Sequence, residues 1–171
     1  MFGFRKNSAP TEANSSTEAS TSAKPSTRAE KLTTKQRGQI GEDAAVLFLK
    51  QNDYQIIERN WRPGNALRGE IDVIAGILDA RGHRVLCFVE VKARSASLSS
   101  LREIAAPQEA VTISKQRQIA RLANAYVSIH HLDEISCRFD VVEVHLTREA
   151  APRCTLCVNA FDYPHERGFE H

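Results

Sequence analysis

The sequence lacks the long apolar segments that would place it in a membrane or send it through one. The longest run of apolar residues, Ala44 to Leu49, has six residues, whereas a transmembrane helix needs about 20. The N-terminal stretch from Met1 to Lys6 has no apolar core of the kind that a secretory signal carries. These absences predict a protein of the cytoplasm, without a membrane partner.

Several kinds of catalytic or metal site also lack their usual pattern. The eight glycines are scattered, so no phosphate-binding glycine loop is predicted. There is no Gly-x-Ser-x-Gly stretch, and no two histidines have helical metal spacing. Cys154 and Cys157 have the spacing of a zinc knuckle, but no second pair follows them. Strand alternation would point these thiols to opposite faces, which favours buried apolar cysteines over a zinc site.

Neither sign of charge dominates the chain. Residues 1–36 hold six of the 23 basic side chains and three of the 21 acidic ones, so the remaining residues are close to neutral. A strongly basic surface is therefore not available to attract nucleic acid. Any phosphate-binding site must be a local cluster.

Composition divides the chain into three parts. Residues 8–27 contain ten Ser or Thr and none of the larger apolar residues, too little apolar surface to offset the entropy lost on ordering. Residues 1–30 are predicted to form a disordered tail, either without function or as a weak electrostatic tether. Residues 31–163 are predicted to form an α/β domain, and residues 164–171 a short C-terminal tail.

Hydrophobic periodicity predicts seven elements in the domain. A helix is expected from Thr33–Thr34, whose hydroxyls can cap it, to about residues 50–53. The expected order is helix, three strands, helix and two strands, which indicates a mixed sheet flanked by helices. The remaining elements are expected at residues 54–58, 71–74, 84–92, 114–128, 137–146 and 154–161, with the strands at 71–74 and 84–92 forming an antiparallel hairpin.

Charged side chains interrupt the two strands of that hairpin. Asp72 lies between β-branched neighbours, and Glu90 and Lys92 close the apolar run that begins at Val85. The strand period of two puts Glu90 and Lys92 on one face. Charges in apolar strands are costly unless they are paired or bound to a metal. Adjacent strands would bring all three side chains together.

This set of side chains suits the hydrolysis of a phosphodiester bond. Two carboxylates at a sheet end match Mg²⁺ or Mn²⁺, which prefer oxygen ligands, and Asp72 and Glu90 are the expected ligands. Lys92 can orient a water molecule or help to deprotonate it. The alternative is a structural ion pair between Glu90 and Lys92 at the end of the strand.

Several short stretches carry a resemblance to a known family. They are Gly41-Glu42, residues 59–62, residues 69–72, residues 88–94, Lys115 with the helix after it, residues 138–142 and residues 159–161. Together they resemble the YraN-like family of small, largely uncharacterised bacterial proteins. That family is similar to the restriction-endonuclease-like (PD-(D/E)XK) superfamily and its Holliday-junction-resolvase branch. The match covers Gln36 to Phe161.

The resemblance implies a restriction-endonuclease-like core: a mixed sheet of four or five strands with a helix on each side. It also implies roles, in which Asp72 and Glu90 hold the metal near the Val91 carbonyl and Lys92 is the superfamily lysine. Glu42 matches an extra acid that reaches the metal through water in resolvase-like members; an exposed helix acid is the alternative. Ile71 departs from the pattern, because the superfamily has Pro before the first acid.

Basic side chains near these acids are candidates for phosphate contacts. Arg94 follows the superfamily lysine, Arg62 precedes the first acid, and Lys115 lies at the start of the second helix, where amide groups also favour an anion. Trp61 can stack on a base, although a core position is favoured. Asp140 is interpreted as a buried hydrogen-bonding acid that positions Arg138 or a loop, and not as a metal ligand.

Three hypotheses follow. The leading one is a Mg²⁺- or Mn²⁺-dependent nuclease acting on DNA, branched or single-stranded. The second is a nucleic-acid-binding module of the same fold that does not cut. The third is a structural or partner-binding protein, in which Glu90 pairs internally with Lys92. The resolvase-like branch tends to form dimers, so a homodimer is also expected.

Overall fold

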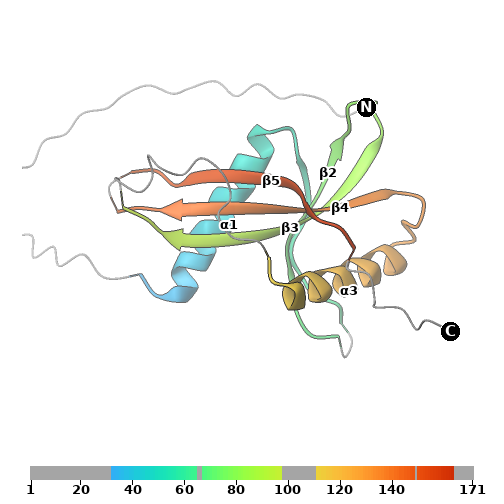
Figure 1. The fold of residues 1–171 in the computed structure, drawn as a ribbon, viewed down its shortest axis with the longest axis horizontal. Coiled ribbons are helices and arrows are strands. Elements are labelled where there is room, and N and C mark those ends of the chain that lie inside the picture. The colour runs from blue at the N-terminus through green and yellow to red at the C-terminus, as the bar shows by residue number, and fades with distance from the viewer. Residues whose placement is uncertain (1–31, 65–66, 98–110, 149, 164–171) are drawn as a thin grey trace, which may run out of the picture. The chain divides into compact units, whose positions relative to one another are not determined.

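The computed structural model describes residues 32–64, 67–97, 111–148 and 150–163. Two helices and five strands make up this part of the chain (Figure 1). Their bounds are α1 Thr34–Gln51, β1 Gln55–Trp61, β2 Ile71–Leu78, β3 Arg84–Ser95, α3 Ile113–Ile129, β4 Ser136–Leu146 and β5 Arg153–Phe161. None of the described helices is long and apolar enough to cross a membrane.

The five strands form one mixed sheet in the order β1-β2-β3-β4-β5. Strands β1, β2 and β3 are antiparallel neighbours, and β5 is antiparallel to β4. The pair β3–β4 is parallel and runs from Val85 opposite Ser136 to Ser95 opposite Leu146. Helix α3 lies between these two strands in the chain and makes their parallel pairing possible, because a parallel pair needs a crossover connection.

Each face of the sheet is covered by one helix. Helix α1 packs its buried Ala45, Val46 and Leu49 on the face that carries Val73, Val89 and Val142. Helix α3 covers the other face, where its buried residues meet apolar residues of β2, β3 and β4. The two helices lie on different sides of the strands in Figure 1. The residues of the second core include Ile74, Phe88, Ile119, Leu122, Tyr126 and Phe139.

A buried acid connects β4 and β5 with Tyr54, the residue before β1, on the α1 side. Asp140 of β4 is fully buried and accepts hydrogen bonds from Tyr54 Oη at 2.9 Å, Arg138 Nε at 3.0 Å and the backbone N–H of Asn159 at 2.9 Å. Arg138 also donates to Tyr54 Oη at 2.7 Å. A buried carboxylate is tolerated only with such partners. The interpretation of Asp140 as a positioning acid is confirmed.

The expected α/β class and mixed sheet are confirmed, with the helix on each side that a restriction-endonuclease-like core requires. Thr33 caps α1, and its side chain and that of Gln36 form a reciprocal capping box. Strand β2 continues to Leu78, four residues beyond its expected end, and β3 continues to Ser95. The proposed tails, residues 1–30 and 164–171, lie outside the described residues.

Two other interpretations of single residues are also settled by the core. Trp61 is 7% exposed and packs edge-on against Tyr126, with ring centroids 5.1 Å apart, so it belongs to the core. Cys154 packs with the cluster under α1, and Cys157 with the cluster under α3. The two thiols therefore point to opposite faces of the sheet, as strand alternation predicts.

Gly41 allows α1 to approach β3 closely. A Cβ atom added at Gly41 would lie 2.4 Å from Ala93 Cβ. Gly41 lies within α1 and Ala93 within β3, and the Cβ of Ala93 is attached directly to the backbone, so no flexible side chain can move aside. The small size of both residues therefore fixes the distance between helix and strand, and with it the position of the next residue, Glu42.

We expect Gly41→Ala to destabilise the protein. Alanine is favoured over glycine in a helix by about 1 kcal/mol, but overpacking of a rigid contact costs about 1–3 kcal/mol, so the clash should dominate. The variant should therefore melt several degrees below the wild type in a thermal unfolding measurement.

Two further variants make this measurement specific. Gly38→Ala is the matched control, because a Cβ at Gly38 meets nothing within 4 Å and should slightly raise the melting temperature. Gly41→Ala combined with Ala93→Gly should recover most of the loss. Equal destabilisation by Gly38→Ala and Gly41→Ala would contradict the close-contact explanation.

Candidate metal and nucleic-acid site

The sheet forks at Asp72. The last paired residues of β2 and β3 are Val73 and Val89, and beyond them the backbone N–H of Val91 donates to Asp72 Oδ2 at 2.7 Å. A side-chain carboxylate thus replaces the main-chain acceptor that a continuing antiparallel ladder would supply. The two strands separate at this point, and the carboxylate stays in the gap.

Glu42 approaches the same gap from α1. It is half-buried, and its Oε2 accepts a hydrogen bond from Asn60 Nδ2 at 3.1 Å. Asn60 has a φ of 52°, a left-handed conformation that asparagine tolerates better than most residues. The end of β1 therefore orients the carboxylate of Glu42, which is half-buried in the structure.

Glu90 is held by a cation from α3. Lys115 Nζ lies 3.0 Å from Glu90 Oε2, and the side chain of Glu90 is only 12% exposed. The third hypothesis predicted an ion pair between Glu90 and Lys92. In the structure the partner of Glu90 is Lys115. Lys115 was expected to contact phosphate, and its ammonium group here neutralises a carboxylate of the site.

Glu42, Asp72 and Glu90 all line one cavity of about 390 Å³. Helix α1 forms one wall, and the ends of β2 and β3 form the other. Its lining comes from Thr34, Arg37, Gly38, Glu42, Asp72, Glu90, Val91 and Ala93. The structure therefore brings three of the predicted residues, Glu42, Asp72 and Glu90, around one space.

The carboxylates interact electrostatically. Burial and the negative charges of Glu90 and Glu42 together raise the pKa of Asp72 to about 7, while the Val91 N–H and the charge of Lys115 act in the opposite direction. A carboxyl group such as Asp72, whose ionisation is opposed in this way, marks a place where added positive charge is strongly favourable. A perturbed carboxyl group beside like charges in a cavity is typical of functional sites.

The carboxylates of the cavity supply some of the oxygen ligands that a hard cation needs. Within the described ranges, no three His, Cys, Asp or Glu side chains are grouped closely enough to hold a metal ion by themselves. Mg²⁺, however, usually takes one or two protein carboxylates and completes its shell with waters and substrate phosphates. Asp72 and Glu90 match that requirement, and the coupling of their charges gives a reason for cation binding.

The remaining predicted residues lie outside the cavity lining. Lys92 is half-buried and follows the lining residue Val91; strand alternation puts it on the same face as Glu90. Arg94 is exposed near the end of β3. Arg62 pairs with Glu70 through a hydrogen bond of 2.8 Å from Nε, and its side chain is 70% exposed.

Sequence reasoning missed two polar residues that belong to the site. Arg37 and Asn60 were not assigned roles, although Arg37 lines the cavity and Asn60 orients Glu42. A signal existed for the first, since Thr34, Gly38 and Glu42 follow the helical spacing i, i+4, i+8 and Arg37 borders that row. No comparable pattern marks Asn60, because its contact spans two elements.

The fold and the cavity define a small α/β protein with a carboxylate-lined fork in a mixed sheet. The family model described as "Uncharacterised protein family UPF0102" matches residues 41–144. This chain belongs to that family, so the resemblance to the YraN-like proteins is confirmed. The matched range contains Glu42, Asp72, Glu90, Lys92 and Lys115.

Curated relatives support the same assignment. A UPF0102 protein of Acetivibrio thermocellus is 42% identical over 135 residues, which cover 77% of this chain and 95% of the relative. A second, from Symbiobacterium thermophilum, is 43% identical over 128 residues, or 75% of this chain and 98% of the relative. A third, from Chlorobium phaeobacteroides, is 45% identical over 107 residues, or 63% and 75%. These names identify a family and state no activity.

We expect Asp72→Asn to stabilise the metal-free protein at high pH. The folded-state pKa of Asp72 is about 7 against a usual 3.8, so folding favours its protonated form. The resulting stability is complete below pH 3.8 and is lost as the pH rises through 7. Asparagine can still accept the Val91 N–H bond but carries no charge. Thermal unfolding with a chelator present should show a gain of several degrees at pH 8 and a smaller one at pH 5.

The contrasting variant is Asp79→Asn. Backbone hydrogen bonds from His83 and Arg81 lower the pKa of Asp79, so its charge favours the folded state at neutral pH. This variant should lower the melting temperature at pH 8, opposite in sign to Asp72→Asn. A loss of stability in both variants would mean that the charge of Asp72 is well accommodated in the metal-free fold.

Proposed function

We propose that this protein is a metal-dependent nuclease that binds nucleic acid and hydrolyses phosphodiester bonds, with branched or single-stranded DNA as its substrate. The observation that carries the proposal is the meeting of Glu42, Asp72 and Glu90, from α1, β2 and β3, around one cavity at the fork of the sheet. Glu42 comes from a helix that is separate from the β2–β3 hairpin, and the fold gains no obvious stability from grouping three acids.

The metal would be Mg²⁺ or Mn²⁺, held by Asp72 and Glu90. Such an ion, when bound, polarises a phosphoryl oxygen and lowers the pKa of a coordinated water. Asp72 is kept in place by the Val91 N–H, and Glu90 by Lys115. Glu42, oriented by Asn60, adds a carboxylate that acts through water.

Basic residues complete the proposed site. Lys92 orients the attacking water and takes part in moving its proton. Arg94 and Arg62 contact backbone phosphates on either side, because phosphate contacts set the position of a nucleic acid without reading its sequence. Lys115 holds Glu90 in an ion pair and, from the start of α3, can also contact a phosphate.

One set of observations favours a second candidate, a module of the same fold that binds nucleic acid without cutting. Lys92 does not line the cavity, and an internal cation, Lys115, already satisfies Glu90. A site of this kind would retain salt-dependent binding and form no product. The cytoplasmic location and the homodimer stay predictions under both candidates.

Metal binding is the first test. Titration calorimetry with Mn²⁺ and Mg²⁺, with and without a short DNA strand, should show binding to the wild type and its loss in the Asp72→Ala/Glu90→Ala double variant. Asp43→Asn is the matched control, since Asp43 adjoins Glu42 in the chain but pairs with Arg59 at 2.6 Å. Absence of metal binding to the wild type, even with DNA present, would contradict the metal site.

Cleavage is the second test. Purified wild type should release product from a labelled branched or single-stranded DNA only when Mg²⁺ or Mn²⁺ is added. Separate substitutions of Asp72, Glu90 and Lys92 by Ala should each abolish cutting and leave the circular dichroism spectrum unchanged. Glu42→Gln should slow cutting by about 10- to 100-fold, the range for residues that act through other ligands.

The outcomes separate the two candidates. Cleavage retained in a triple Ala variant would mean that the activity resides elsewhere or in a contaminant. Binding without product in the wild type, under all metal conditions, would favour the non-cutting module.

A further inference from the structure

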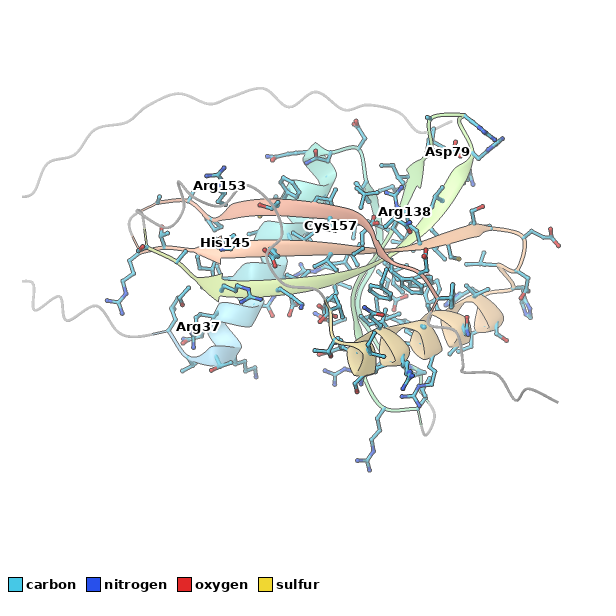
Figure 2. The ribbon with its side chains drawn as sticks, viewed as in Figure 1. Arg37, Asp79, Arg138, His145, Arg153 and Cys157 are labelled. Atoms are coloured by element: carbon cyan, nitrogen blue, oxygen red, sulfur yellow. The ribbon has the colours of Figure 1, made fainter. Side chains whose placement is uncertain are left out.

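Arg37 differs from every other residue that lines the cavity, because it is the one cation among the described lining residues. It lies in the first turns of α1, close to the end of β3 (Figure 2). Three of the other lining residues are acids. The acids by themselves would repel a phosphate. The role of the single cation that faces the same cavity is therefore of interest.

The donors of Arg37 are only partly used. Its Nη1 donates to Ser95 Oγ at 3.1 Å, while its buried Nε–H has no hydrogen-bond partner. A guanidinium has five N–H donors in a planar fork that suits the non-bridging oxygens of a phosphate. An unsatisfied buried donor carries a desolvation cost, which a bound anion would remove.

An ion pair with the acids of the cavity does not account for Arg37. The carboxylate of Glu90 is paired with Lys115, that of Glu42 with Asn60, and that of Asp72 accepts from Val91. The hydrogen bond to Ser95 instead holds the guanidinium toward the end of β3. Beside it, the position of a Cβ on Gly38 is open space, so there is room for a ligand next to Arg37.

We infer that Arg37 binds a backbone phosphate of the nucleic-acid strand, next to the phosphate that meets the carboxylates, and so positions the strand for the reaction. This inference rests on the proposed function and deepens it. Arg37 supplies the attraction for phosphate on the α1 side of the cavity, and the acids supply the reacting centre. Its effect is on the binding and alignment of the strand, so it is a positioning residue.

The test is the salt dependence of DNA binding. Full-length variants are titrated with a labelled single strand and a labelled branched junction, in Ca²⁺ in place of Mg²⁺, over a series of salt concentrations. Arg37→Gln should weaken binding about tenfold and lower the slope of log K against log salt by about 0.7–0.9, the value of one phosphate contact. Lys35→Gln is the matched control, since exposed Lys35 is two residues away and does not line the cavity.

Two more variants separate a phosphate contact from a structural link between α1 and β3. Arg37→Lys keeps the charge but not the planar fork, so it should keep the salt slope and recover part of the affinity. Ser95→Ala removes the hydrogen bond but keeps the charge, so its salt slope should equal that of the wild type. A Ser95→Ala protein that behaves like Arg37→Gln would overturn the inference in favour of the structural link.

The remaining outcomes distinguish this inference from the proposed function. If wild type binds DNA and Arg37→Gln matches Lys35→Gln in affinity and slope, the role of Arg37 is overturned and the proposed function stands. If wild type binds neither probe, both fail together. Melting temperatures of Arg37→Gln and wild type within a few degrees of one another confirm that folded proteins are compared.

Discussion

The hydrogen bond from the Val91 N–H to Asp72 is the contact on which the candidate site depends. Asp72 Oδ2 accepts this bond at 2.7 Å, immediately beyond the last paired residues of β2 and β3. On its other edge β3 stays paired with β4 as far as Ser95. One strand is therefore continuous while its neighbour turns away, and the gap between them is lined by polar groups. The same bond that ends the ladder fixes the first carboxylate of the site.

The groups around this fork are arranged at some expense to stability. Burial and the charges of Glu90 and Glu42 disfavour the ionised form of Asp72, and Gly41 is required where alanine would favour the helix. Natural proteins accept such local conflicts mainly at functional sites. The Asp140 network shows the opposite arrangement, since its carboxylate accepts bonds from three surrounding groups. The carboxylate of Asp140 is satisfied by the fold itself, whereas Asp72 lies where a positive charge would be favourable.

Much of the fold could be predicted from local pattern. The capped start of α1, the antiparallel hairpin of β2 and β3 and the order of all seven elements follow from apolar periodicity and turn residues. The end of β2 was underestimated because Ala75 and Gly76 have low strand propensity, whereas in the structure they are paired with β1 on one side and β3 on the other. The hydrophobic pattern reports on each segment by itself. A strand whose end is extended only by pairing with its neighbours is therefore predicted too short.

The site was predictable to the extent that its residues share a strand or lie in a hairpin. Asp72 and Glu90 were expected together because adjacent strands place them so, and Glu42 came from the family resemblance. The partner of Glu90 could not be foreseen, because Lys115 reaches it from a helix whose position depends on the whole core. Arg37 borders a visible helical row, but its hydrogen bond to Ser95 joins two elements that local pattern does not connect.

The parallel pairing of β3 with β4 has a consequence for the order of assembly. Asp72 and Glu90 belong to one hairpin, so a short loop closure brings them together, whereas Lys115 arrives only with the long crossover through α3 that parallel pairing requires. Non-local pairing forms late and slowly compared with local contacts. We therefore expect the two carboxylates to meet before Lys115 is in place, and their mutual repulsion to oppose the early hairpin. Ionic strength should then influence how fast the chain folds as well as what the folded protein binds.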